Sequence, residues 1–207
     1  MIENLHQAVC IAAPDELLKG IREKFKAVFI DEFQDTDRKQ YEIFQQLFGP
    51  PSDTIAFMIG DPKQSIYAWR KADLFTYFKA VKEADNQFNM STNFRSARSL
   101  IDAFNHFFKP AADFDTFYFK GAADEIAYLP VTSPNPNDKG IMAYNGTEVT
   151  PISFYREDID IPTRVAMQVA KLLSNPNYRI VKNNQSRAIT PADIAILIRN
   201  NYEAPKI

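Results

Sequence analysis

The stretch Ala27–Asp35 reads AVFIDEFQD and places two adjacent carboxylates, Asp31 and Glu32, directly after four apolar residues. Such a run is typical of a buried strand, so both carboxylates are expected at the carboxyl end of that strand. Ligand sites of open α/β sheets lie at that end. There, one carboxylate can bind Mg²⁺ and its neighbour can accept a proton from water. Equally open is the alternative that D-E-x-x-D only begins a loop and caps a helix at Asp37.

The spacing of apolar residues on both sides of this stretch predicts alternating helices and strands. Helices are expected over 15–26, 37–48 and 74–84, and strands over 27–30, 54–59 and near 88–91. The strand over 54–59 is apolar throughout, as strands buried on both faces of a parallel sheet are. This order predicts a doubly wound α/β sheet.

The character of the sequence changes after about residue 88, where we place a domain boundary. Residues 1–88 are expected to form one domain and residues 89–207 a second, incomplete α/β domain. Within the second, the patterns predict a helix over 97–108, short strands within 142–155 that bend at Gly146, a helix over 162–173 and a strand over 194–198.

Composition limits the function classes that are open to the chain. The 207 residues are 45% hydrophobic and 24% charged, which is typical of a soluble globular protein. A single cysteine, Cys10, excludes a disulfide framework, and no apolar run approaches the roughly 18 residues of a membrane span. We therefore expect a cytoplasmic protein. The net charge is −2, so any contact with nucleic acid must be local.

A second polar segment, Gly60–Ala72, reads GDPKQSIYAWRKA and follows the next predicted strand. Its glycine permits a tight turn that presents Gln64 at the same edge of the sheet. The rings of Tyr67 and Trp69, followed by Arg70, suit stacking of unpaired bases beside a phosphate backbone. Taken alone, this segment favours the alternative that both rings are core residues.

The third segment, Ser91–Ser96, reads STNFRS and lies just beyond the proposed boundary. Arg95 could approach a nucleotide from the second domain and neutralise charge on a transferred phosphoryl group. Taken alone, Arg95 would be interpreted as a member of an ordinary surface ion pair.

Together, the three segments resemble motifs II, III and IV of superfamily 1 DNA helicases of the UvrD/Rep type. Within these helicases they are most similar to the RecB-like family, the beta subunits of exodeoxyribonuclease V. The resemblance rests on Ile30–Asp37, Gly60–Tyr77 and Thr92–Ser96, and Ala192–Arg199 resembles a later strand. It implies part of a RecA-like motor domain followed by the beginning of a second motor domain. It also implies ATP and Mg²⁺ as cofactors, with single-stranded DNA and other subunits of a helicase–nuclease complex as partners.

The resemblance also implies roles for the residues at the nucleotide. Asp31 would bind Mg²⁺, and Glu32 would be the catalytic base and a possible second metal ligand. Gln64 would sense the γ-phosphate and Arg95 would act as an arginine finger. Phe94 occupies the position whose ring stacks on adenine in these helicases.

On the DNA side, Tyr67, Trp69 and Arg70 match the segment that contacts single-stranded DNA in the family. Lys71 departs from the pattern, because the family usually has glycine after the arginine. A side chain at that position is expected to shift the turn relative to that of the family.

Two other classes of protein stay open. One is a related motor subunit of a UvrD/Rep-type helicase without nuclease activity. The other is a non-catalytic module that binds nucleic acid or protein and keeps the same fold. A phosphate loop encoded upstream of Met1 would favour a motor, and a nuclease domain downstream would favour the exonuclease subunit.

We predict that the 207-residue chain alone neither hydrolyses ATP nor unwinds DNA. None of its six glycines begins the pattern G-x-x-x-x-G-K-[ST], so the lysine that cradles the triphosphate in such motors is absent from this sequence. The measurement is ATP turnover by the purified chain with and without single-stranded DNA. DNA-stimulated turnover would contradict the prediction.

Overall fold

The computed structural model describes residues 1–65, 73–111, 126, 128–137, 139–156 and 160–206. Contacts between residues divide the chain into two compact units. Unit 1 contains the described residues of Met1–Asn89 together with Ile126, and unit 2 begins at Met90 and contains every described residue from Tyr128 onward. The assignment of residues 1–88 and 89–207 to two motor domains stays a prediction.

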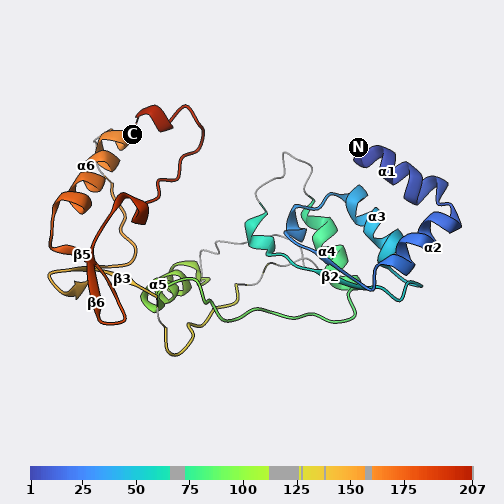
Figure 1. Ribbon diagram of the computed structural model, residues 1–207, viewed down its shortest axis with the longest axis horizontal. Coiled ribbons are helices and arrows are strands. Elements are labelled where there is room, and N and C mark those ends of the chain that lie inside the picture. The colour runs from blue at the N-terminus through green and yellow to red at the C-terminus, as the bar shows by residue number, and fades with distance from the viewer. Residues whose placement is uncertain (66–72, 112–125, 127, 138, 157–159, 207) are drawn as a thin grey trace. The chain divides into compact units, whose positions relative to one another are not determined.

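The helices and strands of each unit are labelled in Figure 1 where space allows. Those of unit 1 are α1 Ile2–His6, the π-helix η1 Gln7–Ala12, α2 Asp15–Lys24, β1 Ala27–Ile30, η2 Phe33–Asp35, α3 Arg38–Phe48, β2 Ile55–Met58, η3 Pro62–Gln64 and α4 Leu74–Glu83. Those of unit 2 are α5 Arg98–Phe108, β3 Ile141–Tyr144, β4 Thr147–Glu148, α6 Ile161–Ser174, β5 Tyr178–Lys182, β6 Gln185–Ala188, η5 Pro191–Asp193 and η6 Ala204–Lys206.

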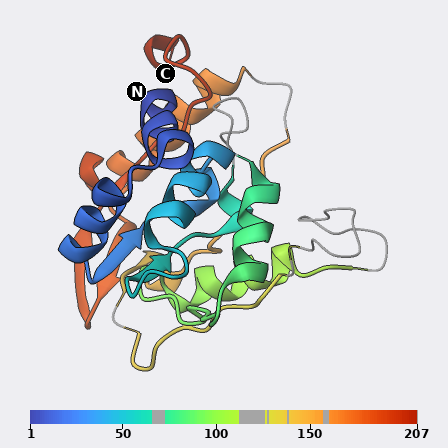
Figure 2. The same cartoon turned by 90° about the vertical axis from the view of Figure 1, so that its right-hand side faces the viewer.

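The centre of unit 1 is the parallel pair β1 and β2, whose register runs from Ala27 opposite Ile55 to Ile30 opposite Met58. Parallel strands need a crossover connection, and α3 provides it between these two. Helices α3 and α4 lie beside the pair (Figures 1 and 2). Phe33, Tyr41 and Ala80 are buried there, with Ile30 and Met58 of the strands packed against them. The predicted α/β class is confirmed.

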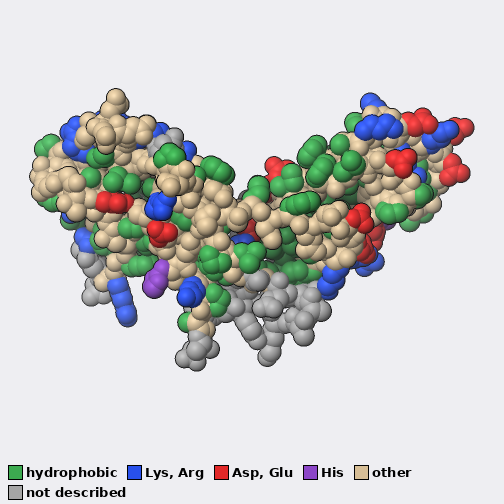
Figure 3. Space-filling model, turned by 90° about the horizontal axis from the view of Figure 1, so that it is seen from below, with side chains coloured by type: hydrophobic (Ala, Val, Ile, Leu, Met, Phe, Trp, Pro, Cys, Tyr) green, Lys and Arg blue, Asp and Glu red, His purple; other side chains and the backbone are tan. Residues whose placement is uncertain are grey.

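One expectation about the strands is wrong. The strand predicted over 54–59 forms as β2, but its side chains alternate between half-buried and exposed instead of being buried on both faces. Phe29 of β1 is 66% exposed and stacks on Phe57 of β2 with 4.6 Å between ring centroids. Apolar side chains also lie at the surface elsewhere in both units (Figure 3). An apolar run therefore identified the strand but did not show how many of its faces are covered.

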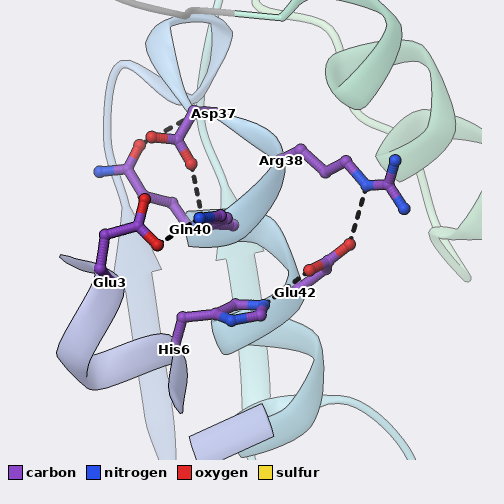
Figure 4. A network of polar contacts seen from close by, with 7 residues as sticks. Glu3, His6, Asp37, Arg38, Gln40 and Glu42 are labelled. Carbon is purple, nitrogen blue, oxygen red and sulfur yellow. Dashed lines mark hydrogen bonds and ion pairs between the residues drawn. The ribbon is translucent and has the colours of Figure 1, made fainter. Parts of the chain in front are cut away.

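A second cluster joins the amino-terminal helices of unit 1 to α3. Val9, Leu18, Ile43 and Leu47 are buried in it. The predicted helices over 15–26 and 37–48 are confirmed as α2 and α3. Asp37 caps α3 through a reciprocal pair, because its carboxylate accepts from the Gln40 backbone N–H at 2.8 Å and its own N–H donates to Gln40 Oε1 at 3.0 Å. The cap is drawn in Figure 4.

In unit 2, four antiparallel strands form a sheet in the order β4-β3-β5-β6. The predicted bend is confirmed, because Gly146 has φ +80° in the turn between β3 and β4. The turn between β5 and β6 consists of Asn183 and Asn184, both with positive φ. The hairpin of β5 and β6 was not predicted, although an Asn pair tolerates that conformation better than most residues do.

The remaining expectations for unit 2 have mixed outcomes. The helices predicted over 97–108 and 162–173 form as α5 and α6. The strand predicted over 194–198 is wrong, because those residues pair with no described strand and Leu197 is fully exposed. The extended piece expected near 88–91 contributes only backbone bonds around the bridge between Thr92 and Thr132. Among the described residues, no helix is both long enough and apolar enough to cross a membrane.

Polar contacts also join α1 to α3 in unit 1 (Figure 4). The carboxylate of Glu42 lies 2.7 Å from His6 Nε2 and accepts a hydrogen bond of 2.8 Å from Arg38 Nε. Lys39 forms an ion pair with Glu3. The hydrogen bond from Arg38, followed by the one from His6, holds the pKa of Glu42 below its ordinary value.

We predict that Glu42→Gln makes the stability of unit 1 less sensitive to acid. A carboxyl group whose pKa is lowered on folding stabilises the fold above its ordinary pKa of about 4.3, and this contribution is lost as pH falls through the lowered pKa. Hydrogen exchange of α1 and α3 between pH 6 and pH 3 measures the effect. Glu16→Gln, at an exposed position of α2, is the control and should keep the steeper acid dependence. An identical pH dependence in Glu42→Gln and the unmodified chain would contradict the prediction.

Candidate functional site

The carboxylates Asp31 and Glu32 lie at the end of β1, and both are exposed. Beyond the strand, Glu32 adopts the left-handed conformation with φ 51° and ψ 40°. Its backbone N–H donates to Asp31 Oδ1 at 2.9 Å. Such a conformation is unfavourable for a residue with a side chain and is often found at functional sites. It follows directly on the end of β1 and begins the 3₁₀ turn η2.

The turn after β2 lies beside this strand end. Ile59 donates its backbone N–H to Ile30 at 2.9 Å, and Phe33 donates to Ile59 at 2.8 Å. Hydrogen bonds of the parallel pair thus continue past both strands. As a result, the residues that follow β1 and those that follow β2 are held together at one edge of the sheet, as the sequence predicted.

Asp61 organises the turn that carries Gln64. Its carboxylate accepts from the Lys63 backbone N–H at 3.1 Å and from Gln64 Nε2 at 3.0 Å, and it lies 2.7 Å from Lys63 Nζ. Burial alone would raise the pKa of Asp61, but the hydrogen bonds from Lys63 and Gln64 outweigh burial and hold that pKa below its ordinary value. The turn is therefore held by its own hydrogen bonds and by an ion pair between Asp61 and Lys63. Gln64 itself is exposed, and its amide nitrogen has a second hydrogen to donate.

Gln34 connects the residues that follow β1 to those that follow β2. Its Nε2 donates to Glu32 Oε2 at 2.7 Å, and its Oε1 accepts from the Asp61 backbone N–H at 3.0 Å. Only 2% of Gln34 is exposed. Sequence reasoning missed both Gln34 and Asp61. The available signal was a polar residue, Gln34, two positions after Glu32 within the segment Ala27–Asp35.

The predicted site residues fall into three groups. Asp31, Glu32 and Gln64 lie in unit 1, and the structure links Glu32 to Gln64 through Gln34 and Asp61. The predicted DNA contacts, Tyr67, Trp69 and Arg70, lie outside the described residues, as does Lys71.

Phe94 and Arg95 lie in unit 2, and both are exposed. Their loop is shaped by Asn93, whose side-chain oxygen accepts from the backbone N–H groups of Arg95 at 2.8 Å and Ser96 at 3.1 Å. Both bonds use backbone N–H groups and do not involve the guanidinium of Arg95. The approach of Phe94 and Arg95 to a nucleotide stays a prediction.

The residues of unit 1 suit a magnesium–nucleotide complex. Mg²⁺ is usually held by one or two protein carboxylates together with phosphate oxygens and water. Asp31 offers an exposed carboxylate at the carboxyl end of a parallel strand, with Glu32 beside it. The exposed amide of Gln64 is a neutral donor of the kind that can contact a phosphate oxygen.

Residues 2–85 match a family model described as the UvrD/REP helicase N-terminal domain. The matched region includes the candidate site of unit 1 and both strands of the parallel pair. Over these residues, the chain is therefore similar to the amino-terminal domain of UvrD/Rep-type helicases.

More specifically, the chain is similar to proteins named RecBCD enzyme subunit RecB. It is 36% identical over 200 residues to that of Buchnera aphidicola subsp. Acyrthosiphon pisum, covering 90% of this chain and 16% of the relative. It is 30% identical over 220 residues to that of Escherichia coli K12, covering 100% of this chain and 18% of the relative. The Chlamydia trachomatis protein is 36% identical over 203 residues, covering 95% and 18%. The predicted resemblance to the RecB-like family is confirmed, over a chain that spans less than a fifth of these relatives.

We predict that Gly60→Ala destabilises the site. A Cβ at this position would lie 2.6 Å from Gln34 Oε1 and 3.0 Å from the Gln34 backbone nitrogen. Relieving these contacts should cost about 1–3 kcal/mol of local stability. Hydrogen exchange of β2 and η2 peptides in the whole chain measures this cost.

The matched control is Gly20→Ala in the middle of α2, where a Cβ would meet nothing within 4 Å. Alanine is the better helix former, so this variant should stabilise α2 by about 0.5–1 kcal/mol. Equal effects of the two substitutions on the exchange of β2 would contradict the interpretation of Gly60.

Proposed function

We propose that this chain is part of an ATP-dependent DNA helicase of the RecB type, which couples ATP hydrolysis to translocation along single-stranded DNA. The observation that supports this function best is the bonded path from Glu32 through Gln34 and Asp61 to Gln64. This path joins the carboxylate of Glu32, which follows β1, to the amide of Gln64, which follows β2. Phosphoryl-transfer sites need such groups at fixed positions, because catalysis there depends on positioning and electrostatic stabilisation.

In this proposal, the residues of unit 1 divide the work of hydrolysis. Asp31 holds the metal ion, Glu32 accepts the proton of the attacking water, and Gln64 donates to the terminal phosphate. When bound, the magnesium–ATP complex supplies the phosphoryl group and a cation that neutralises its oxygens. Gln34 donates to Oε2 of Glu32, and the proposal assigns Oε1 to the water.

The residues of unit 2 complete the nucleotide site in the proposal. The guanidinium of Arg95 neutralises charge on the transferred phosphoryl group, and the ring of Phe94 stacks on adenine. Both are exposed, and the backbone of Arg95 is fixed by Asn93.

The DNA contacts belong to the same segment as the phosphate sensor. Tyr67 and Trp69 follow Gln64 by three and five residues in the sequence, and Arg70 comes next. Aromatic rings with a neighbouring arginine bind single strands by stacking and by phosphate contact. In the proposal, a movement of the Gln64 turn would therefore also move the DNA-binding residues that follow it.

The RecB-type proposal extends to partners and setting. The similar proteins are named as subunits of the RecBCD enzyme, so we propose that the protein containing this chain also assembles with other subunits. It would act in recombinational DNA repair in the cytoplasm, with exonuclease activity carried by a separate domain. The inactivity of the 207-residue chain alone belongs to the same proposal.

The test is Glu32→Gln in a longer polypeptide that includes this chain and a phosphate loop. The substitution keeps the size of the side chain and removes its ability to accept a proton. ATP turnover should fall by about 10²–10⁴-fold, while the dissociation constants of ATP and single-stranded DNA change little. Unchanged turnover would reject Glu32 as the base.

Trp69→Ala serves as the counterpart on the DNA side. It should weaken binding of single-stranded DNA by about 1–3 kcal/mol and should reduce translocation more than basal hydrolysis. Equal affinity of both proteins for single strands would count against the stacking role.

A further inference from the structure

We propose that Gln34 is a positioning residue that couples the phosphate-sensing turn to the catalytic base. This inference rests on the proposed function and extends it, because it explains how a change at Gln64 would reach Glu32. Gln34 does not touch the reacting atoms in this scheme. Its role is to fix the position of Glu32 according to the position of the turn.

The burial and hydrogen bonds of Gln34 support this role. The residue is buried, yet both ends of its amide are hydrogen-bonded. The Nε2 end donates to Glu32 Oε2 at 2.7 Å, and the Oε1 end accepts from the Asp61 backbone N–H at 3.0 Å. The main chain adds a third link, because Ser65 Oγ lies 3.4 Å from the Gln34 carbonyl oxygen and can donate to it. A buried amide with satisfied partners has few alternative positions, since losing either bond would leave a polar group unpaired.

The chemistry of the partners explains why an amide is needed at this position. The carboxylate of Glu32 can only accept, and the N–H of Asp61 can only donate. A neutral side chain that bridges them must therefore donate at one end and accept at the other, which an amide does. A glutamate would place two carboxylates together, and a lysine would offer no acceptor.

Close packing makes the connection stiff. Gly60 lies so near Gln34 that a Cβ there would come within 2.6 Å of its Oε1. The 3₁₀ turn that carries Gln34 is closed by bonds from Asp35 to Glu32 at 2.9 Å and from Thr36 to Phe33 at 3.0 Å. A shift of the turn after β2 would therefore move Asp61 against Gln34 and, through the amide, displace the carboxylate of Glu32.

The experiment uses Gln34→Met and Gln34→Glu in the longer polypeptide, with Gln46→Met as the matched control. Gln46 lies in α3 of the same unit and is half-buried. Gln34→Met removes both side-chain bonds and should lower the kcat of DNA-stimulated ATP turnover about 10–100-fold, because misplaced catalytic groups lose about that much. The KM for ATP should change less than about threefold, since nucleotide binding does not use Gln34. Gln46→Met should resemble the unmodified protein.

The second variant, Gln34→Glu, distinguishes a loss of positioning from a general loss of folding. Gln34→Glu retains an acceptor for the Asp61 N–H and replaces only the donor that faces Glu32. It should lower kcat by at least about tenfold. Hydrogen exchange at the Asp61 amide should remain as protected as in the unmodified protein. Turnover within twofold of the unmodified protein in both Gln34 variants would overturn the proposal, and so would a loss of ATP binding that accounts for the loss of turnover.

A double substitution separates this proposal from the proposed function. In a Glu32→Gln background, Gln34→Met should cause less than a further twofold loss, because the group that it positions is already inactive. A full additional loss would overturn the positioning role. If Glu32→Gln alone left turnover unchanged, the assignment of the base would fail. If Glu32→Gln abolished turnover while Gln34→Met did not lower it, only the role of Gln34 would fail.

Discussion

The candidate site depends on the parallel hydrogen bonding of β1 and β2. Parallel pairing brings two carboxyl ends to one edge, and the bonds from Ile59 to Ile30 and from Phe33 to Ile59 extend the pairing into the polar residues that follow. An antiparallel pair would have placed these residues at opposite ends. Both Glu32 and the Gln64 turn owe their proximity to this backbone arrangement, and no direct bond between them is needed.

That edge combines local strain with dense polar bonding. Glu32 has a left-handed backbone, which costs about 1–3 kcal/mol and persists only where surrounding structure imposes it. Here the surrounding structure includes the 3₁₀ turn closed at Asp35 and the bond from Gln34. Buried aromatic packing of Phe33 against Tyr41, with ring centroids 6.0 Å apart, anchors the same turn to α3. The core and the site are thus supported by neighbouring residues of one short segment.

Sequence reasoning found the elements with strong local patterns and missed those that depend on partners. The capping residue Asp37 and the apolar spacing of α3 are local, so this helix was predicted nearly to the residue. The exposure of Phe29 depends on what covers the sheet, and the failed strand at 194–198 depends on a neighbouring strand to pair with. The sequence DEFQD also predicted Asp31 and Glu32 as site residues, and that assignment stays a prediction. The role of Gln34 needed a distance to Asp61, which lies 27 positions away.

The candidate residues are divided between the two units. Glu32 and Gln64 are already connected within unit 1, so their relative position does not require Arg95. Arg95 has its own local support from Asn93 within unit 2. Each unit thus positions its own candidate residues through hydrogen bonds formed within that unit.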